Sequence, residues 1–278
     1  MAITISVVNE KGGCGKTTTA YSLAQGLRIR GYKVLGIDMD SQGNFSTTWG
    51  SDPECIGIVD VLMRNEDPLE AIQKKDKRFD LISGDKLLRD FAAKTGYEVN
   101  FVLDAAVSQL EDKYDVIVID TPPTVATLTT NALMASNYVL IPATPESYSV
   151  DGLVQLHESI RAIQRRGNQK NLKILGILIT RFRKGTRLAT DMTGIIRAVA
   201  DKIGTYVFES RIRENMAIKE AQTAKKSIFE YDRHANGYYD YNRFIDEAVK
   251  EILKDYPDFK PTGEPINGLI FDDEEVKN

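Results

Sequence analysis

A glycine-rich turn near the N-terminus constrains this chain more than any other feature. Residues 3–8 form a short β-branched run, and apolar side chains recur at helical spacing through residues 17–30. Residues 11–18, at the junction of the two, read Lys-Gly-Gly-Cys-Gly-Lys-Thr-Thr. A strand, a glycine turn containing Gly-Lys-Thr and a helix, in that order, are typical of a loop that binds nucleotide phosphates.

The residue types in this turn explain how it would hold phosphate. Glycines let successive backbone N–H groups curl around the phosphates, and the N-terminus of the following helix adds its positive dipole end. Lys16 supplies a charge for the β- and γ-phosphates, and the Thr17 hydroxyl is a ligand for Mg²⁺. The sequence therefore predicts a site for ATP and Mg²⁺ whose nucleotide-binding residues are Lys11, Gly12, Gly13, Cys14, Gly15, Lys16, Thr17 and Thr18.

Further apolar runs alternate with helical stretches along the chain. The runs cover residues 34–38, 116–120, 138–142 and 174–180, and helical periodicity also marks residues 188–199 and 241–252. This alternation predicts the α/β class, with a mostly parallel, twisted β-sheet covered by helices on both faces. We expect residues 1–256 to form a single P-loop ATPase domain and residues 257–278 to form a loosely ordered acidic tail.

Carboxylates follow two of the predicted strands. Asp38 ends the run at residues 34–38, and Asp40 follows two positions later. This spacing of two along an extended chain puts both side chains on one side. Asp120 ends the third run, directly after four β-branched residues. Because ligands bind at the carboxyl ends of strands in open α/β sheets, we expect Asp120 to hold Mg²⁺ through water.

Charge and cysteine content limit the possible partners and compartment. The formal net charge of −4 argues against coating DNA through bulk charge, so any DNA contact must come from a local basic patch. Two cysteines, Cys14 and Cys55, are too few for a disulfide framework or a zinc site, which fits a reducing cytoplasm. No apolar run approaches the roughly 18 residues of a membrane span. We therefore expect a cytoplasmic protein with no membrane partner.

The turn carries a second lysine, Lys11, five residues before Lys16. With it the turn resembles the deviant Walker A motif of the ParA/MinD family, and ParA/Soj-type partition ATPases in particular. The resemblance runs from about residue 2 to about residue 254. It implies that Lys11 reaches across a nucleotide-sandwiched homodimer to neutralise charge developing on the partner's ATP.

Residues 38–44, Asp-Met-Asp-Ser-Gln-Gly-Asn, resemble the switch I segment of the same family, with Ser41 in place of the usual proline. The resemblance implies that Asp40 positions the attacking water and that Asp38 lies in the outer shell of the magnesium. The expected catalytic residues are Lys11, Lys16 and Asp40, and the expected metal-site residues are Thr17, Asp38 and Asp120.

The resemblance also implies nonspecific DNA binding through basic residues around the edge of the dimer. The candidates are Arg183, Lys184, Arg187, Arg213 and Lys219. Residues 212–221 align with a family segment in which arginines are usual at two positions that this chain fills with Glu214 and Ala217. By the same analogy, Thr180 and Arg213 contribute to the adenine pocket.

Other branches of the class fit less well. The chain ends in acidic residues, whereas membrane-bound relatives end in a basic amphipathic helix. No cysteine follows Cys55, so an iron–sulfur cluster cannot be bridged between two copies. The tyrosines at 238, 239 and 241 precede an apolar helical pattern, which favours packing over the tyrosine-rich tail of the related kinases.

The resemblance implies an ATPase that partitions DNA. We expect it to dimerise around Mg-ATP, to bind nonspecific double-stranded DNA on the nucleoid, and to be reset when a ParB-like centromere-binding protein stimulates hydrolysis. The alternative that stays open is a ParA-like ATPase that positions a protein cargo without binding DNA.

Overall fold

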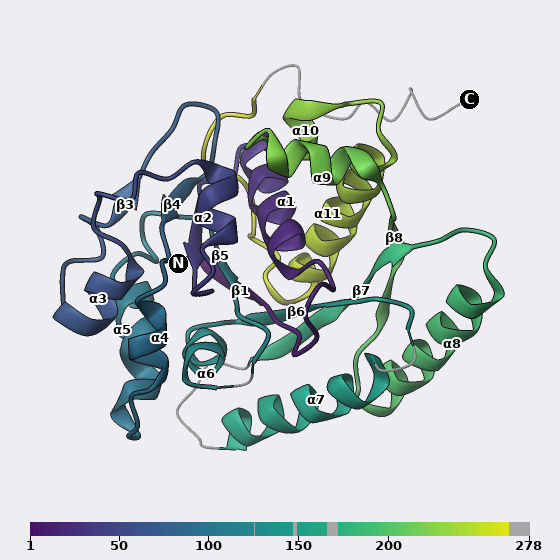
Figure 1. The fold of residues 1–278 in the computed structure, drawn as a ribbon, viewed down its shortest axis with the longest axis horizontal. Helices are drawn as coiled ribbons and strands as arrows, with labels where there is room; N and C mark the ends of the chain where they lie inside the picture. Colours follow the sequence, from purple (N-terminus) through teal and green to yellow (C-terminus); the bar gives the residue numbers. More distant parts are fainter. Residues whose placement is uncertain (125, 147–148, 166–171, 267–278) are drawn as a thin grey trace.

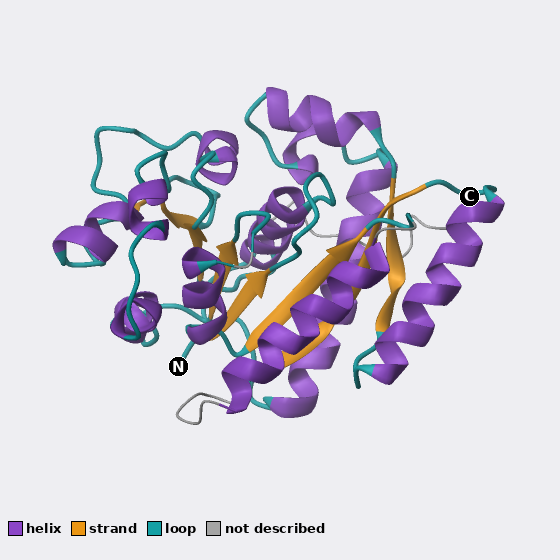
Figure 2. Ribbon diagram, turned by 60° about the horizontal axis from the view of Figure 1, so that its bottom comes forward, coloured by secondary structure: helices purple, strands orange, loops and turns teal. Residues whose placement is uncertain are grey.

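The computed structural model describes residues 1–124, 126–146, 149–165 and 172–266. Within these residues the chain forms a twisted eight-stranded sheet in the order β3-β4-β2-β5-β1-β6-β7-β8 (Figures 1 and 2). Neighbouring strands run parallel except β3 with β4. The strands are β1 Ile3–Val7, β2 Val34–Asp38, β3 Ile72–Gln73, β4 Asp80–Ile82, β5 Val116–Asp120, β6 Tyr138–Ala143, β7 Lys173–Phe182 and β8 Val207–Arg213.

Helices cover both faces of this sheet (Figure 1). They are α1 Lys16–Ile29, α2 Asn44–Trp49, α3 Ile58–Arg64, α4 Leu88–Ala92, α5 Val102–Ser108, α6 Thr127–Met134, α7 Ser149–Arg165, α8 Arg187–Lys202, α9 Met216–Thr223, α10 Ile228–Tyr231 and α11 Asn236–Asp255. Helices α1, α2, α10 and α11 share a core with one face of the sheet. On the other face of the sheet, helices α3 to α6 pack into one core and helices α6 to α8 pack into a second core. The predicted α/β fold is confirmed.

The central strand β1 shows how the sequence divides the two faces. Ile3, Ile5 and Val7 alternate along it and pack into the α1/α11 core. The intervening Ser6 faces the other side, where its hydroxyl lies 2.6 Å from that of Ser136. A parallel strand buried on both faces must satisfy such polar groups internally, and this pair does so.

Three strands of the sheet were not expected from the sequence. β3 and β4 are two and three residues long, too short to show a period. β8 is an edge strand in which Val207, Phe208 and Ile212 are buried and the residues between them are partly or fully exposed.

The predicted loose tail differs from the structure in its first ten residues. The backbone of residues 257–266 returns to the end of α1, where Gly263 N donates to Gly31 O and Ile266 N to Ile29 O, both at 2.9 Å. The Phe259 ring stacks on Tyr32 with centroids 4.7 Å apart. Apolar side chains therefore hold this stretch against the domain, and the remainder of the predicted tail, 267–278, lies outside the described residues.

The tyrosines before the last helical pattern pack as expected, since Tyr238 and Tyr241 are buried in the core. Among the described residues, no helix combines the length and apolar character needed to cross a membrane.

Candidate nucleotide-binding site

The glycine turn closes over the N-terminus of α1 in a conformation that its glycines make possible. Gly13 and Gly15 have φ angles of 74° and 88°, a left-handed region that side chains with a Cβ rarely adopt. Gly15 is the N-cap of α1, and its carbonyl accepts the Thr19 N–H at 2.9 Å. Cys14 is buried, and its carbonyl accepts the Thr180 hydroxyl at 2.7 Å. The turn thus leaves its backbone N–H groups at a helix start, as a phosphate site requires.

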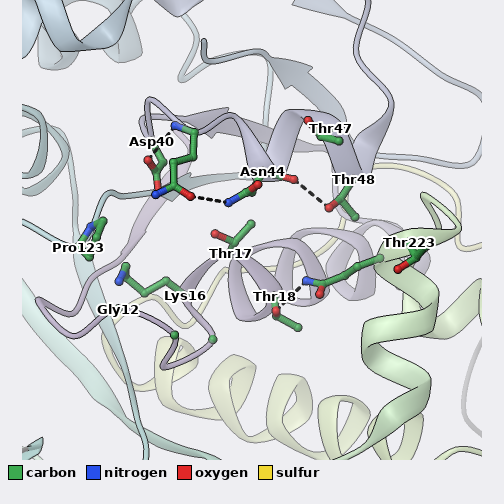
Figure 3. A pocket seen from close by; sticks show the side chains of 14 residues that line it. Gly12, Lys16, Thr17, Thr18, Asp40, Asn44, Thr47, Thr48, Pro123 and Thr223 are labelled. Carbon is green, nitrogen blue, oxygen red and sulfur yellow. Dashed lines mark hydrogen bonds between the residues drawn. The ribbon is translucent and has the colours of Figure 1, made fainter. Parts of the chain in front are cut away.

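A polar cavity of about 570 Å³ opens in front of this turn. Figure 3 shows Lys16 and Thr17 on its α1 side, with Asp40 facing them from the end of β2. The other walls come from α2, α9 and the segment after β5; the lining residues there are Gln42, Asn44, Thr47, Thr48, Pro123, Gln222 and Thr223. The loop lysine, the threonine predicted as a metal ligand and the candidate water-positioning carboxylate thus share one cavity.

Asp38 and Asp40 are held by a dense set of hydrogen bonds. Asp38 accepts the Ser46 N–H at 2.9 Å and the Ser46 hydroxyl at 2.7 Å, and it also accepts the Asp40 N–H at 3.0 Å. Asp40 accepts the Gln42 N–H at 3.0 Å. Complete burial raises the pKa of Asp38 from 3.8 to about 6, against the lowering effect of these donors. Asp38 therefore lies behind Asp40 and orders the loop that carries it.

Asp120 is the buried carboxylate with unmet hydrogen-bonding capacity. It pairs in register with Asp38 across β2 and β5, and neither of its oxygens has a hydrogen-bond partner among the described residues. Burial first, and the neighbouring Asp38 second, raise the pKa of Asp120 well above its ordinary value. The nearby Thr17 hydroxyl lowers this pKa in part, and a buried carboxylate beside a hydroxyl has the oxygen donors that suit Mg²⁺.

The metal site implied by these residues is incomplete without a substrate. No group of three or more His, Cys, Asp or Glu side chains within the described ranges could cage a metal. Mg²⁺ is usually bound through one or two protein oxygens together with waters and phosphates. The pattern of Thr17 and Asp120 fits that mode, in which the phosphates supply the remaining ligands.

Replacing Asp120 by Asn should stabilise the nucleotide-free protein. A carboxyl group whose folded pKa is raised favours folding at low pH, and this contribution is lost as the pH rises through the folded pKa. We therefore expect D120N to raise the free energy of unfolding by about 1–3 kcal/mol at pH 8, and by less at pH 5. Thermal unfolding at both pH values measures this change. The increase in thermal stability that Mg-ADP gives the wild type should be smaller in D120N. An equal effect at the two pH values would contradict it.

A second cavity of about 230 Å³ adjoins the first on the other side of Thr18. Thr180 and Arg213, the predicted adenine contacts, both line it, as do Asn215 and Ile218. The Gln222 amide of α9 donates to the Thr18 hydroxyl at 2.8 Å and borders both cavities. Gln222 was not foreseen, because a glutamine in an amphipathic helix carries no motif. The linings of the two cavities share Gly13, Gly15, Thr18 and Gln222, so the cavities adjoin at the turn.

Arg213 has a structural partner that the sequence did not indicate. Its Nε and Nη2 both bond Asp240 of α11, with a closest N–O distance of 2.6 Å, and its backbone N–H donates to the same carboxylate. The Asp240 side chain is only 8% exposed. This pairing ties β8 to α11 and takes two of the three guanidinium nitrogens, so it disfavours Arg213 as a DNA contact.

The side chains of the two lysines of the turn bind different groups. Lys16, which lines the 570 Å³ cavity, donates from Nζ to the Lys11 carbonyl at 3.0 Å. Lys11 Nζ points instead to the end of β6, where it bonds Thr144 at 3.1 Å and Glu146 at 2.5 Å. The hydrogen bond from Lys11 lowers the pKa of Glu146. In the single chain, Lys11 is thus bound to a carboxylate outside its own phosphate site.

The remaining basic candidates for DNA contact differ in their exposure and in their acidic partners. Arg187, the first residue of α8, has a side chain that is 95% exposed, with Asp191 at 3.8 Å. Lys184 and Lys219 are exposed. Arg183, in contrast, bonds Glu214 through its Nε. The structure therefore brings Lys184 and Arg187 to one exposed turn and pairs Arg183 with an acid.

Known proteins resemble this chain over most of its length. A family model described as AAA domain matches residues 2–174. The chromosome-partitioning ATPase Soj of Thermus thermophilus is 32% identical over 249 residues, which cover 89% of this chain and 96% of that protein. The chromosome partitioning protein ParA of Myxococcus xanthus is 34% identical over 255 residues, covering 88% of this chain and 87% of that one.

Solved structures share the fold as well. Apo McdA from Cyanothece matches with a TM-score of 0.80 at 23% identity, over 91% of this chain and all of that one. A plasmid partition protein from Borrelia burgdorferi matches with a TM-score of 0.71 at 28% identity, over 91% and 99%. Cobyrinic acid a,c-diamide synthase from Mycobacterium smegmatis, with a bound ATP analog and magnesium, matches with a TM-score of 0.75 at 26% identity, over 95% and 100%.

Proposed function

This chain belongs to the ParA/Soj family of partition ATPases, and on that premise we propose that it is an ATP-dependent DNA-partitioning ATPase. It dimerises around Mg-ATP, binds nonspecific DNA in that state, and releases it on hydrolysis stimulated by a ParB-like centromere-binding protein. The observation that carries the proposal is the meeting of Lys16, Thr17 and Asp40 in one cavity, with the buried Asp120 close to Thr17. ATP and Mg²⁺ are its cofactors, and it acts at the nucleoid.

Each residue of the cavity has a distinct task in this scheme. The N–H groups of residues 12–18 and the Lys16 ammonium bind and orient the phosphates. Thr17 and Asp120 would hold Mg²⁺, which when bound would supply positive charge to offset that of the phosphates. Asp40, fixed by the Gln42 N–H, orients the attacking water and accepts its proton.

The contacts of Lys11 support a requirement for two copies. Its ammonium is bound to Thr144 and Glu146 and turned away from its own phosphate cavity, while its backbone carbonyl takes the Lys16 side chain. A second copy that presents its nucleotide at this face offers Lys11 a more highly charged partner than Glu146. Slow turnover in the absence of a partner protein is the expected behaviour of such a site.

A DNA-binding assay with controlled nucleotide and salt tests the proposal. We expect the wild type to bind a random-sequence duplex with ATP, more weakly with ADP and without nucleotide, and with affinity that falls steeply as salt rises. Light scattering should show a dimer in the ATP state. An ATP-dependent dimer that ignores DNA under all salt conditions would contradict the DNA-partitioning role.

That last outcome would favour a second candidate, a positioning ATPase that places a protein cargo by the same dimer switch. The specific observation behind it is that two arginines of the expected DNA surface, Arg183 and Arg213, are bound to Glu214 and Asp240. A surface neutralised in this way suits a protein partner better than a polyanion.

A further inference from the structure

Glu214 stands directly after β8, where it meets two arginines at the end of β7. Its carboxylate bonds Arg183 Nε through one oxygen, and its other oxygen lies 3.9 Å from Arg181 Nη2. Its backbone N–H donates to the Phe182 carbonyl at 3.1 Å, which continues the parallel pairing of the two strands. The acid is therefore fixed between these arginines by the sheet itself, not by a mobile loop contact.

Arg181 connects this cluster to the phosphate turn. Its Nη1 donates to the Gly13 carbonyl at 3.1 Å, and its backbone has a φ of 51°, a left-handed conformation that is uncommon for a residue with a long side chain. Arg181 and Glu214 both line the 230 Å³ cavity beside Thr18. The contacts thus run without interruption from Gly13 through Arg181 and Glu214 to Arg183.

The Glu214 carboxylate can affect DNA binding because of where Arg183 lies. Its side chain is 70% exposed, and Lys184 and Arg187 close to it in sequence are exposed too, so Arg183 belongs to a basic turn. A DNA phosphate that approaches this turn has to displace a carboxylate already bound to the guanidinium. The strength of phosphate binding therefore depends on what Glu214 contacts.

We propose that Glu214 is an internal counter-ion that withholds Arg183 from DNA while the nucleotide cavity is empty. A base in that cavity contacts Arg181 and Glu214, loosens the pair with Arg183 and frees the guanidinium for phosphate. The inference rests on the proposed DNA-binding function and adds a regulatory residue to it.

Glu214→Gln tests the proposal, with Glu209→Gln as its matched control. Glu209 lies on β8, five residues before Glu214, and pairs with an exposed arginine, Arg197, at 2.9 Å, so its replacement removes the same charge from the same part of the chain. Without nucleotide, we expect E214Q to bind a random-sequence duplex about 5- to 20-fold more tightly than E209Q. Its salt dependence should be steeper by about one phosphate contact. With ATP the two variants should converge.

Two further variants make the outcome specific. In an E214Q background, Arg183→Gln should abolish the gain, and Arg183→Gln alone should weaken binding in the ATP state more than in the nucleotide-free state. Equal nucleotide-free affinities for E214Q and E209Q would overturn the counter-ion role. If E214Q unfolds, unequal effects of Arg183→Gln in the two nucleotide states still support it, and equal effects overturn it.

The same experiment distinguishes failure of the counter-ion role of Glu214 from failure of the proposed DNA-partitioning function. A wild type that binds DNA with ATP, together with an E214Q that behaves as E209Q, leaves the partition role standing and removes the counter-ion. A wild type that ignores DNA even with ATP contradicts the partition role, and a gain by E214Q over E209Q would then still identify Glu214 as the residue that suppresses DNA binding.

Discussion

Replacement of Asp40 by Asn is expected to lower ATP turnover by about 10²- to 10³-fold while nucleotide binding is retained. The carboxylate faces the phosphate turn across the cavity and is held by the Gln42 N–H, a contact that an asparagine oxygen can keep. The loop should therefore keep its shape. The lost property is the negative charge that accepts a proton from the attacking water.

The consequence for the D40N protein is accumulation of the ATP state. Phosphate release measured with and without DNA gives the loss in turnover, and light scattering with ATP should show a dimer that persists where the wild type dissociates. Asp52→Asn, in the exposed loop after α2, is the control for loss of a carboxylate on the same segment. A D40N protein that hydrolyses ATP at the wild-type rate would remove Asp40 from the mechanism.

Lys16→Ala is expected to weaken ATP binding itself, by about 10²- to 10³-fold. The Lys16 side chain is buried, and its ammonium lies on the Lys11 carbonyl inside the phosphate cavity. Without it, the charge of the phosphates would be brought beside the buried carboxylates Asp38 and Asp120 with much less compensation. The variant should lose turnover, dimer formation and ATP-dependent DNA binding together.

Titration with a fluorescent ATP analogue measures this loss directly. Lys250→Ala, which removes an exposed lysine of α11, should leave both affinity and turnover unchanged. The two predictions are distinguished by their pattern, since D40N loses turnover but keeps ATP, whereas K16A loses both. A K16A protein with wild-type affinity would contradict the assignment of the cavity to ATP.

Much of the fold could be predicted because its central strands are continuous apolar runs. Val34–Asp38 and Val116–Asp120 match the structure to the residue, since strands buried on both faces leave little room for polar residues. Edge strands lack that constraint. β8 exposes Glu209 and has partly exposed residues around it, so its pairing with β7 is determined by tertiary contacts that no local pattern carries.

The site divides in the same way. The turn could be predicted from its motif and Asp120 from its place at the end of a buried strand, whereas Asp40 could be predicted from the resemblance to the family's switch I segment. Gln222 and Asp240 could not, because each acts through a partner more than twenty residues away in sequence, Thr18 and Arg213 respectively. The amphipathic helices that carry them place many polar side chains at similar spacing, and only the packing of α9 and α11 selects these two.

The position of β1 in the middle of the sheet also bears on how the protein folds. The first strand of the chain pairs with β5 and β6, and Ile3 lies opposite Val116 while Val7 lies opposite both Asp120 and Leu140. A ribosome must therefore release residues up to about the end of β6 before β1 can gain both neighbours. Such long-range pairing slows folding and leaves strand edges open in the nascent chain. The phosphate turn follows β1 directly, so it should acquire its shape late, after the strands on both sides have closed around it.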